Sequence, residues 1–155
     1  MTVDYRIASD DDVPVMRVIF EEYANSLGID LSYQNLAGEL ADLPGRYAPP
    51  EGGVIIAFNR GEPCGCVALR GMDAALCEMK HLYVRPDARG LGIGAELVKR
   101  VVEMAREKGY RSVRLDTLPS MKSAVSLCKL AGFKEIPAYI RNALPGTVFM
   151  EKKLR

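Results

Sequence analysis

The chain has 155 residues, of which 48% are hydrophobic and 26% are charged, a composition typical of one soluble globular domain with a single core. Because its 21 Lys and Arg nearly balance its 20 Asp and Glu, no net field would draw it onto nucleic acid or an anionic membrane. We therefore expect one domain over residues 1–155 and a small uncharged or amphoteric partner.

The chain shows no pattern of export or of membrane insertion. No apolar run approaches the roughly 18 residues that cross a bilayer, and residues 1–5 lack the basic-then-apolar order of a secretory signal. We expect a cytoplasmic protein whose four Cys are reduced and packed as small hydrophobes. No metal is expected, because Cys64 and Cys66 are too close for the usual zinc spacing and His81 is the only His.

The first part of the chain predicts a strand followed by two helices. Residues 3–8 alternate weakly as a strand, and Ser9 with the three Asp that follow can cap a helix ending near Gly28. A second helix is predicted to start at Asp30 or Ser32, and Pro44 with the Gly after it ends that helix.

The middle of the chain predicts three strands and then a long helix. Residues 53–59 and 63–70 form a hairpin, and a third strand covers residues 74–84. A helix over residues 91–108 carries an apolar stripe of period 3.6, and Gly109 is its expected C-terminal cap.

A last group of elements completes the sheet. Residues 112–116 predict a strand, Thr117 or Ser120 can cap a helix that ends at Gly132, and residues 147–152 predict the final strand. Hairpins early in the chain and a strand-helix-strand unit late imply a mixed sheet with helices on both faces.

A glycine-rich turn connects the third strand to the long helix. In such a turn, backbone N–H groups converge on an anion that also feels the positive end of the helix dipole, so a phosphate or pyrophosphate is the expected ligand. The glycines at 90, 92 and 94 do not fit the dinucleotide spacing G-x-G-x-x-G, and no Gly-Lys-Ser/Thr of a P-loop follows.

The motif Arg89-x-x-Gly92-x-Gly94, preceded by the strand 78–84, resembles the pyrophosphate motif of the GNAT acetyltransferase superfamily. The block 120–133, which ends in Gly-Phe, is similar to a second family motif, and the resemblance extends over nearly the whole chain. It implies an α+β fold with a central mixed, mostly antiparallel sheet, helices on both faces and a splayed parallel strand pair. It also implies acetyl-CoA as cosubstrate and transfer of its acetyl group to the primary amine of a small molecule, with a homodimer left open.

The resemblance further implies where the cosubstrate lies. The pyrophosphate would bind the turn, and the pantetheine arm would run between Leu82–Val84 and the strand that begins at Ser112. One backbone N–H of the former segment would polarise the thioester carbonyl. The cosubstrate-binding residues implied are Leu82, Tyr83, Val84, Arg89, Gly90, Leu91, Gly92, Ile93, Gly94, Ala95, Thr117 and Ser123.

Two residues in the strand before the glycine turn are candidates for proton transfer from the acceptor amine. An amine near pKa 10.4 must lose a proton before it attacks, and Glu78 resembles the strand glutamate that acts through water as a base in part of the family. Glu78 can equally pair with Lys80 or a nearby Arg. His81 titrates near neutrality, but an isolated His in a strand is more often structural.

Protonation of the leaving thiolate has no clear donor. The family commonly places a Tyr five residues before the Phe of Gly-Phe, where this chain has Cys128. A thiol there could donate, or it could be a packed small hydrophobe. Tyr139, before the last strand, is either a replacement acid or an amphipathic lid residue.

The resemblance places the acceptor wall at Arg46, Tyr47, Tyr139, Arg141 and Asn142, where two arginines could grip a carboxylate of an amino-acid-like amine. A basic group at a helix end could either stabilise the dipole or touch the 3′-phosphate of the cosubstrate: Arg106, Lys108, Arg111 and Arg114. Two alternative functions remain: acetylation of a protein or peptide amine, and a CoA-binding sensor or interaction domain of weak activity.

Overall fold

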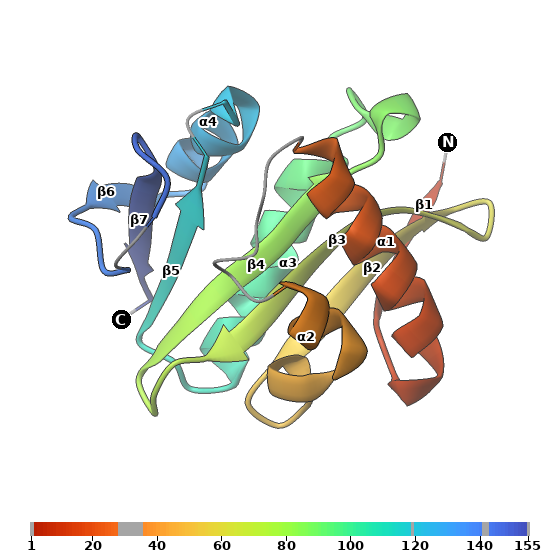
Figure 1. Cartoon of the computed structure of the whole chain (residues 1–155), viewed down its shortest axis with the longest axis horizontal. Helices are drawn as coiled ribbons and strands as arrows, with labels where there is room; N and C mark the ends of the chain where they lie inside the picture. Colours follow the sequence, from red (N-terminus) through yellow and green to blue (C-terminus); the bar gives the residue numbers. More distant parts are fainter. Residues whose placement is uncertain (1, 28–35, 119, 141–142, 155) are drawn as a thin grey trace.

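The structure is a computed structural model that describes residues 2–27, 36–118, 120–140 and 143–154. Its strands form one seven-stranded sheet in the order β1-β2-β3-β4-β5-β7-β6 (Figure 1). The strand bounds are β1 Val3–Ile7, β2 Gly53–Asn59, β3 Glu62–Gly71, β4 Leu76–Val84, β5 Ser112–Thr117, β6 Lys134–Ile136 and β7 Val148–Lys153.

The pairing of β4 with β5 is parallel, whereas all other neighbouring strands are antiparallel. This parallel pairing covers only Leu76–Glu78 against Ser112–Arg114. Beyond that point the two strands diverge, and Figure 1 shows the gap widening toward their C-terminal ends. The predicted mixed, mostly antiparallel sheet with a splayed parallel pair is therefore confirmed.

Helices cover both faces of the sheet. Helices α1 (Val13–Ser26) and α2 (Leu36–Ala41) lie in front of the sheet in Figure 1, and α3 (Ile93–Glu107) passes behind it. Helix α4 (Lys122–Leu130) packs against α3 in the rear layer.

The apolar pattern of the sequence separates these two layers. In β2, Val54 and Ile56 pack in the front core with α1, while Ile55 and Ala57 pack in the rear core with α3. In α3, the stripe that includes Leu97 is fully buried in the rear core. Complete burial of one such Leu contributes on the order of 1.5–3 kcal/mol.

The start of α1 agrees with the predicted cap. The backbone N–H of Ser9 donates to Asp12 Oδ2 at 2.9 Å, and Arg6 pairs with Asp12 Oδ1 at 2.6 Å. The hydrogen bond from Ser9 is the main cause that lowers the pKa of Asp12. The helix ends at Ser26, so the predicted end at Gly28 and the next predicted start lie outside the described residues.

Three predicted boundaries need correction. Helix α3 begins at Ile93 rather than at residue 91, because Gly90 and Gly92 adopt left-handed conformations with φ of 85° and 77° and extend the turn. Helix α4 has Met121 at its N-cap position, so the prediction of a cap at Thr117 or Ser120 was wrong. Residues 134–136, for which no strand was predicted, form β6 against β7.

Both predicted glycine caps are present. Gly109 and Gly132 have φ of 88° and 99°, which is the conformation that ends a helix and that residues with a Cβ avoid. After Gly132, the N–H of Phe133 donates to the Cys128 carbonyl at 3.0 Å, and Phe133 is buried in the rear core.

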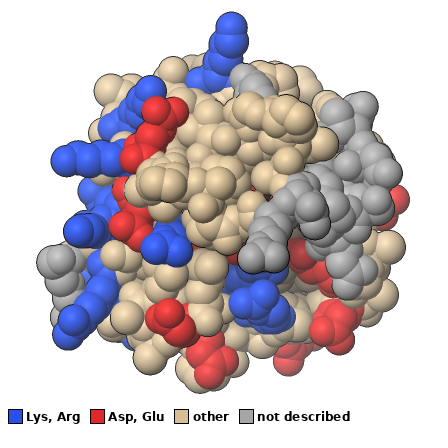
Figure 2. All heavy atoms as spheres, turned by 60° about the vertical axis from the view of Figure 1, so that its left-hand side comes forward, with Lys and Arg blue, Asp and Glu red and all other residues tan. Residues whose placement is uncertain are grey.

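The surface charge, the cysteines and the length of the helices complete the description of the fold. Figure 2 shows Lys and Arg side chains beside Asp and Glu side chains on the exposed face rather than a field of one sign. The four cysteines are free and buried. No helix in the described part of the chain is long and apolar enough to cross a membrane.

Candidate active site

A bulge in β4 shapes the centre of the site. Cys66 of β3 faces Tyr83, but Ala68 faces Lys80, so β4 has one extra residue in this interval. His81 lies within the bulge and has a φ of 56°, a left-handed conformation that is uncommon for a residue with a side chain. Four consecutive residues around the bulge line the same pocket: Met79, Lys80, His81 and Leu82.

A groove of about 560 Å³ lies between the end of β4, the glycine turn and the first turns of α3 and α4. Gly92 is the N-cap of α3, and a Cβ built on Gly90 or Gly92 would meet no atom within 4 Å. The left-handed backbone therefore requires these two glycines, and their open side is free for a ligand. Gly94 differs, because its Cβ would lie 3.0 Å from the Leu127 side chain of α4.

The groove collects most of the predicted cosubstrate residues. It is lined by Leu82, Tyr83, Val84, Arg89, Gly90, Gly92, Ile93, Gly94, Ala95 and Ser123. Of the two other predicted residues, Thr117 lines the adjoining pocket, and Leu91 lines neither cavity and is 47% exposed. Arg89 Nε donates to the Val84 carbonyl at 3.1 Å, which fixes the turn to the end of β4.

Sequence reasoning missed several lining residues. The groove is also lined by Ala88, Ser120, Met121, Lys122, Ala124 and Leu127. All but the first belong to the block 120–133 that carried the family resemblance, but only Ser123 of this block was predicted as a cosubstrate-binding residue. The signal that could have found them is topological: β4 and β5 are parallel, so the segments that follow both strands meet at one edge of the sheet.

A smaller pocket of about 70 Å³ adjoins the groove. The two cavities share Leu82, Met121 and Ala124, so they meet at the splay between β4 and β5. Helix α1 contributes Tyr23 and Ala24 to the pocket, and most of the remaining lining is apolar. The described lining residues with a charged side chain are Lys80 and Asp116.

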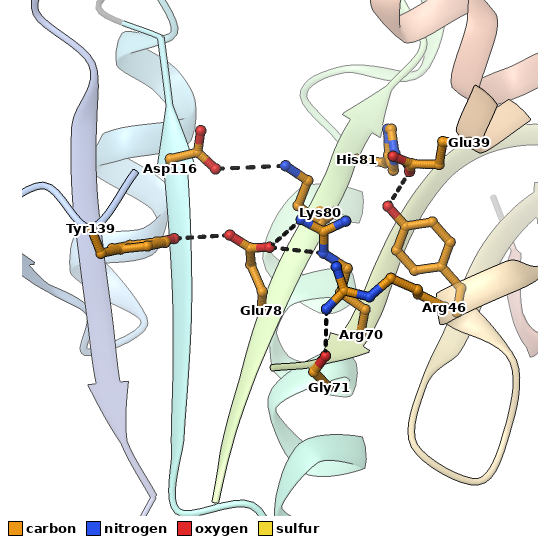
Figure 3. Close-up of polar contacts among 10 residues, drawn as sticks. Glu39, Arg46, Arg70, Gly71, Glu78, Lys80, His81, Asp116 and Tyr139 are labelled. Atoms are coloured by element: carbon orange, nitrogen blue, oxygen red, sulfur yellow. Dashed lines mark hydrogen bonds and ion pairs between the residues drawn. The ribbon is translucent and has the colours of Figure 1, made fainter. Parts of the chain in front are cut away.

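Lys80 and Asp116 face each other across the diverging strands (Figure 3). Lys80 Nζ lies 3.7 Å from Asp116 Oδ1, and the two side chains are 11% and 6% exposed. This pair is the first charged contact beyond the point where β4 and β5 stop pairing. It therefore lies at the narrow end of the splay.

Glu78, the predicted base, is buried in a compact network beside this pair (Figure 3). It is 1% exposed, and its Oε1 accepts from Arg70 Nε at 2.9 Å and pairs with Arg70 Nη2 at 2.7 Å. Its other oxygen accepts from the Tyr139 hydroxyl at 3.0 Å. Glu78 is therefore paired with an Arg, Arg70, which was the alternative to its role as a base. It lines neither cavity. A role as base stays a prediction.

The two candidate acids have different surroundings. Burial, followed by the charge of Glu78, raises the pKa of the Tyr139 hydroxyl, whose proton is already directed at Glu78. Cys128 lines the small pocket, is 1% exposed and packs in the rear core, and burial raises its pKa to about 11. A thiol that weak is a poor donor to a thiolate of ordinary basicity, so these features favour the packing role.

A second buried network surrounds His81. Its Nε2 lies 2.7 Å from Glu39 Oε1, which also accepts from the Tyr47 hydroxyl, and its ring stacks on Phe20 with centroids 4.2 Å apart. Burial lowers the pKa of His81, and Glu39 only partly opposes this. Burial alone would raise the pKa of Glu39, but the hydrogen bonds from His81 and Tyr47 outweigh it and lower the pKa.

The residues predicted for the acceptor wall are not brought together at the pocket. Tyr47 is 2% exposed in the front core, and Arg46 Nη2 donates to the Gly71 carbonyl at 2.8 Å. Neither lines the groove or the adjoining pocket. Arg141 and Asn142 lie outside the described residues.

The basic residues predicted to cluster near the end of α3 make contacts elsewhere. Arg106 pairs with Glu103, Lys108 donates to the Pro50 carbonyl and Arg114 pairs with Glu151. Within the described chain, none of the four basic residues of this group lines the groove.

A glycine turn at a helix N-terminus, beside a splayed parallel strand pair, makes this chain an α+β protein with an open groove at the kind of helix end that binds anions in other proteins. Comparison with known proteins specifies the class. Residues 17–133 match the model of the acetyltransferase (GNAT) family. The chain belongs to the GNAT family of N-acetyltransferases, which are acyltransferases.

Relatives and solved structures agree with this assignment. An uncharacterised N-acetyltransferase of Schizosaccharomyces pombe is 39% identical over 145 residues, 92% of this chain and 89% of the relative. An acetyltransferase of the GNAT family from Staphylococcus aureus superimposes with a TM-score of 0.80 at 21% identity, covering 99% and 100% of the two chains. A phosphinothricin acetyltransferase from Sinorhizobium meliloti, solved with acetyl-CoA, has a TM-score of 0.72 at 21% identity, covering 99% and 89%.

Proposed function

We propose that the chain transfers the acetyl group of acetyl-CoA to the primary amine of a small acceptor, by direct attack within a ternary complex. The observation that carries this proposal is the junction of the two cavities at Leu82, Met121 and Ala124. A thioester that enters from the groove and an amine that enters the pocket would meet there, at the splay of β4 and β5.

The groove is suited to hold the cosubstrate by main-chain contacts. The N–H groups of the turn at Gly90–Gly94 and the N-terminal end of α3 attract a pyrophosphate. The extended arm would lie along Leu82–Val84, where β4 has left β5 and its edge is free to pair with a ligand. An N–H of this segment would polarise the thioester carbonyl.

The reaction requires the acceptor to change its protonation state. The neutral amine nitrogen attacks the thioester carbon, a C–N bond forms and the C–S bond breaks, with its electron pair leaving on sulfur. Two protons leave the nitrogen overall: the ammonium loses one before attack, and the second is lost as the amide forms. One proton ends on the sulfur to give free CoA, and the other goes to solvent.

The size of the pocket supports a small acceptor. A cavity of about 70 Å³ is smaller than the roughly 150 Å³ that holds a benzene ring. It therefore has room only for the reacting ends of the two substrates. Among the relatives, the thialysine N-epsilon-acetyltransferase of Sus scrofa is 40% identical over 58 residues, 37% of this chain and 34% of the relative. Its name describes a small primary amine, which is the class of acceptor that we propose.

A CoA-binding sensor is the second candidate, and Cys128 is the observation that favours it. The position that resembles the family's acid holds a buried thiol with a raised pKa. A leaving thiolate needs less protonation than an alkoxide would, so loss of this acid weakens catalysis without preventing it. We therefore keep the enzyme as the leading proposal.

One experiment separates the two functions. The protein is incubated with acetyl-CoA and a panel of primary amines, and free thiol release is followed against a reaction without amine. The proposed function expects amine-dependent thiol release. Acetyl-CoA that raises the melting temperature without thiol release from any amine would instead support the sensor. Release with a peptide but with no small amine would support protein acetylation.

A further inference from the structure

Lys80 and Asp116 form a long ion pair, and both residues line the pocket. Their closest atoms are 3.7 Å apart, beyond hydrogen-bonding distance, and both side chains are nearly buried. Neither side chain makes a hydrogen bond to another described residue of the chain.

The neighbouring pair Arg70 and Glu78 shows how a structural ion pair is built in the same part of the sheet. There the guanidinium approaches the carboxylate at 2.7 and 2.9 Å, and the Tyr139 hydroxyl satisfies the remaining oxygen. That network lines neither cavity, whereas Lys80 and Asp116 both line the pocket. The looser pair therefore has free hydrogen-bonding capacity at the place where a ligand would bind.

From this contrast, we propose that Lys80 and Asp116 bind the head group of a zwitterionic acceptor, in which the reacting amine and a carboxylate are on the same carbon atom. Asp116 accepts hydrogen bonds from the ammonium group and Lys80 donates to the carboxylate. The inference rests on the proposed function and specifies its acceptor as an α-amino acid.

The shape of the site agrees with this assignment. In an α-amino acid the two charged groups are separated by one carbon atom, which matches two receptor charges that are close but not hydrogen-bonded to each other. The small volume of the pocket accommodates such a head group. Apolar residues that also line the pocket, Leu27, Leu36 and Leu118, favour an uncharged side chain.

Matched acceptors and variants test the proposal. The acceptors are uncharged α-amino acids and the carboxamide of each, which keeps the ammonium group and removes the carboxylate. The variants are Lys80→Gln and Asp116→Asn, and Arg100→Gln is the control because it removes an ion pair on the exposed surface of α3. Kd for acetyl-CoA and the melting temperature are measured for each variant.

We expect the wild type to prefer the amino acid over its carboxamide by about 10- to 100-fold in kcat/KM, since a hydrogen bond to a charged group is lost. Lys80→Gln should abolish this preference, and Asp116→Asn should raise KM for both acceptors. Kd for acetyl-CoA should not change in either variant. Calorimetric binding of the amino acid to the protein saturated with CoA gives the same comparison without turnover.

Other outcomes overturn the inference. Equal use of amino acid and carboxamide by the wild type would show that no carboxylate is recognised. If Lys80→Gln lowers the melting temperature and weakens acetyl-CoA binding while the preference stays, the pair only ties β4 to β5. If amines that lack a carboxylate cause thiol release in the wild type but amino acids do not, the proposed function stands and this inference fails. If none of the amines causes thiol release, the proposed function is contradicted. Absence of amino acid binding in the calorimeter would then overturn the inference as well.

Discussion

Replacing Gly92 by Ala should weaken acetyl-CoA binding, and Gly61 provides a closely matched control. The two glycines have φ of 77° and 79°, and a Cβ at either position would meet no atom within 4 Å. A left-handed conformation costs a residue with a Cβ roughly 1–2 kcal/mol. Both substitutions should therefore lower the free energy of unfolding by this amount.

The two positions differ in their place in the fold. Gly61 is in the tight turn between β2 and β3, whereas Gly92 lines the groove and caps α3. An added methyl group at Gly92 would lie where a pyrophosphate must approach the N–H groups of the turn. We expect Kd for acetyl-CoA to rise at least tenfold in Gly92→Ala, a loss of about 1.4 kcal/mol, and to stay unchanged in Gly61→Ala.

Calorimetric titration with acetyl-CoA measures the first effect, and urea unfolding measures the second. If both variants lose similar stability and both bind acetyl-CoA as the wild type does, the turn is not the pyrophosphate site. If Gly61→Ala weakens binding as much as Gly92→Ala, the loss comes from general destabilisation and the reasoning from the groove is refuted.

Three further predictions concern the buried polar groups. Glu78→Gln should lower kcat and remove the acidic limb of the pH–rate profile if Glu78 is the base, and an unchanged profile would exclude that role. Cys128→Ala should leave kcat unchanged and cost about 1 kcal/mol of unfolding free energy, whereas a large fall in kcat would identify the thiol as the acid. The folded state holds His81 and Glu39 with lowered pKa values, so it binds fewer protons than the unfolded chain, and stability should fall as pH drops below about 6.5. His81→Gln should reduce that fall between about pH 6.5 and 5 in urea unfolding, and an unaltered slope would contradict the lowered pKa of His81.

The features predicted well from the sequence are those with local causes. A glycine with positive φ, such as Gly92 or Gly132, can be recognised because few other residues adopt that backbone. The stripe on α3 repeats with the period of the helix, so its buried face follows from residue spacing alone. Ten of the residues that line the groove could be named in advance because all but Ser123 lie in one contiguous segment of the chain, and their role in binding the cosubstrate stays a prediction.

The features that were missed depend on strand register. The bulge at His81 exists only relative to β3, and no residue type around it signals an extra position. Glu78 could have paired with Lys80 or with an Arg, and the choice of Arg70 follows from their direct opposition in the β3–β4 register. Asp116 was not predicted as a site residue, because a charged residue in a strand normally faces solvent.

The two substrate sites therefore differ in how the chain encodes them. Acetyl-CoA would bind mostly to main chain between Leu82 and Ala95, so many substitutions of neighbouring side chains would leave that site intact. The pocket that we propose for the acceptor combines side chains from α1, α2, β4, β5 and α4, and its charge comes from Lys80 on one side of the splay and Asp116 on the other. Because these two strands no longer pair at that point, a substitution of either residue can change the acceptor without altering the sheet. We infer that the splay itself separates the choice of acceptor from the binding of the acetyl donor.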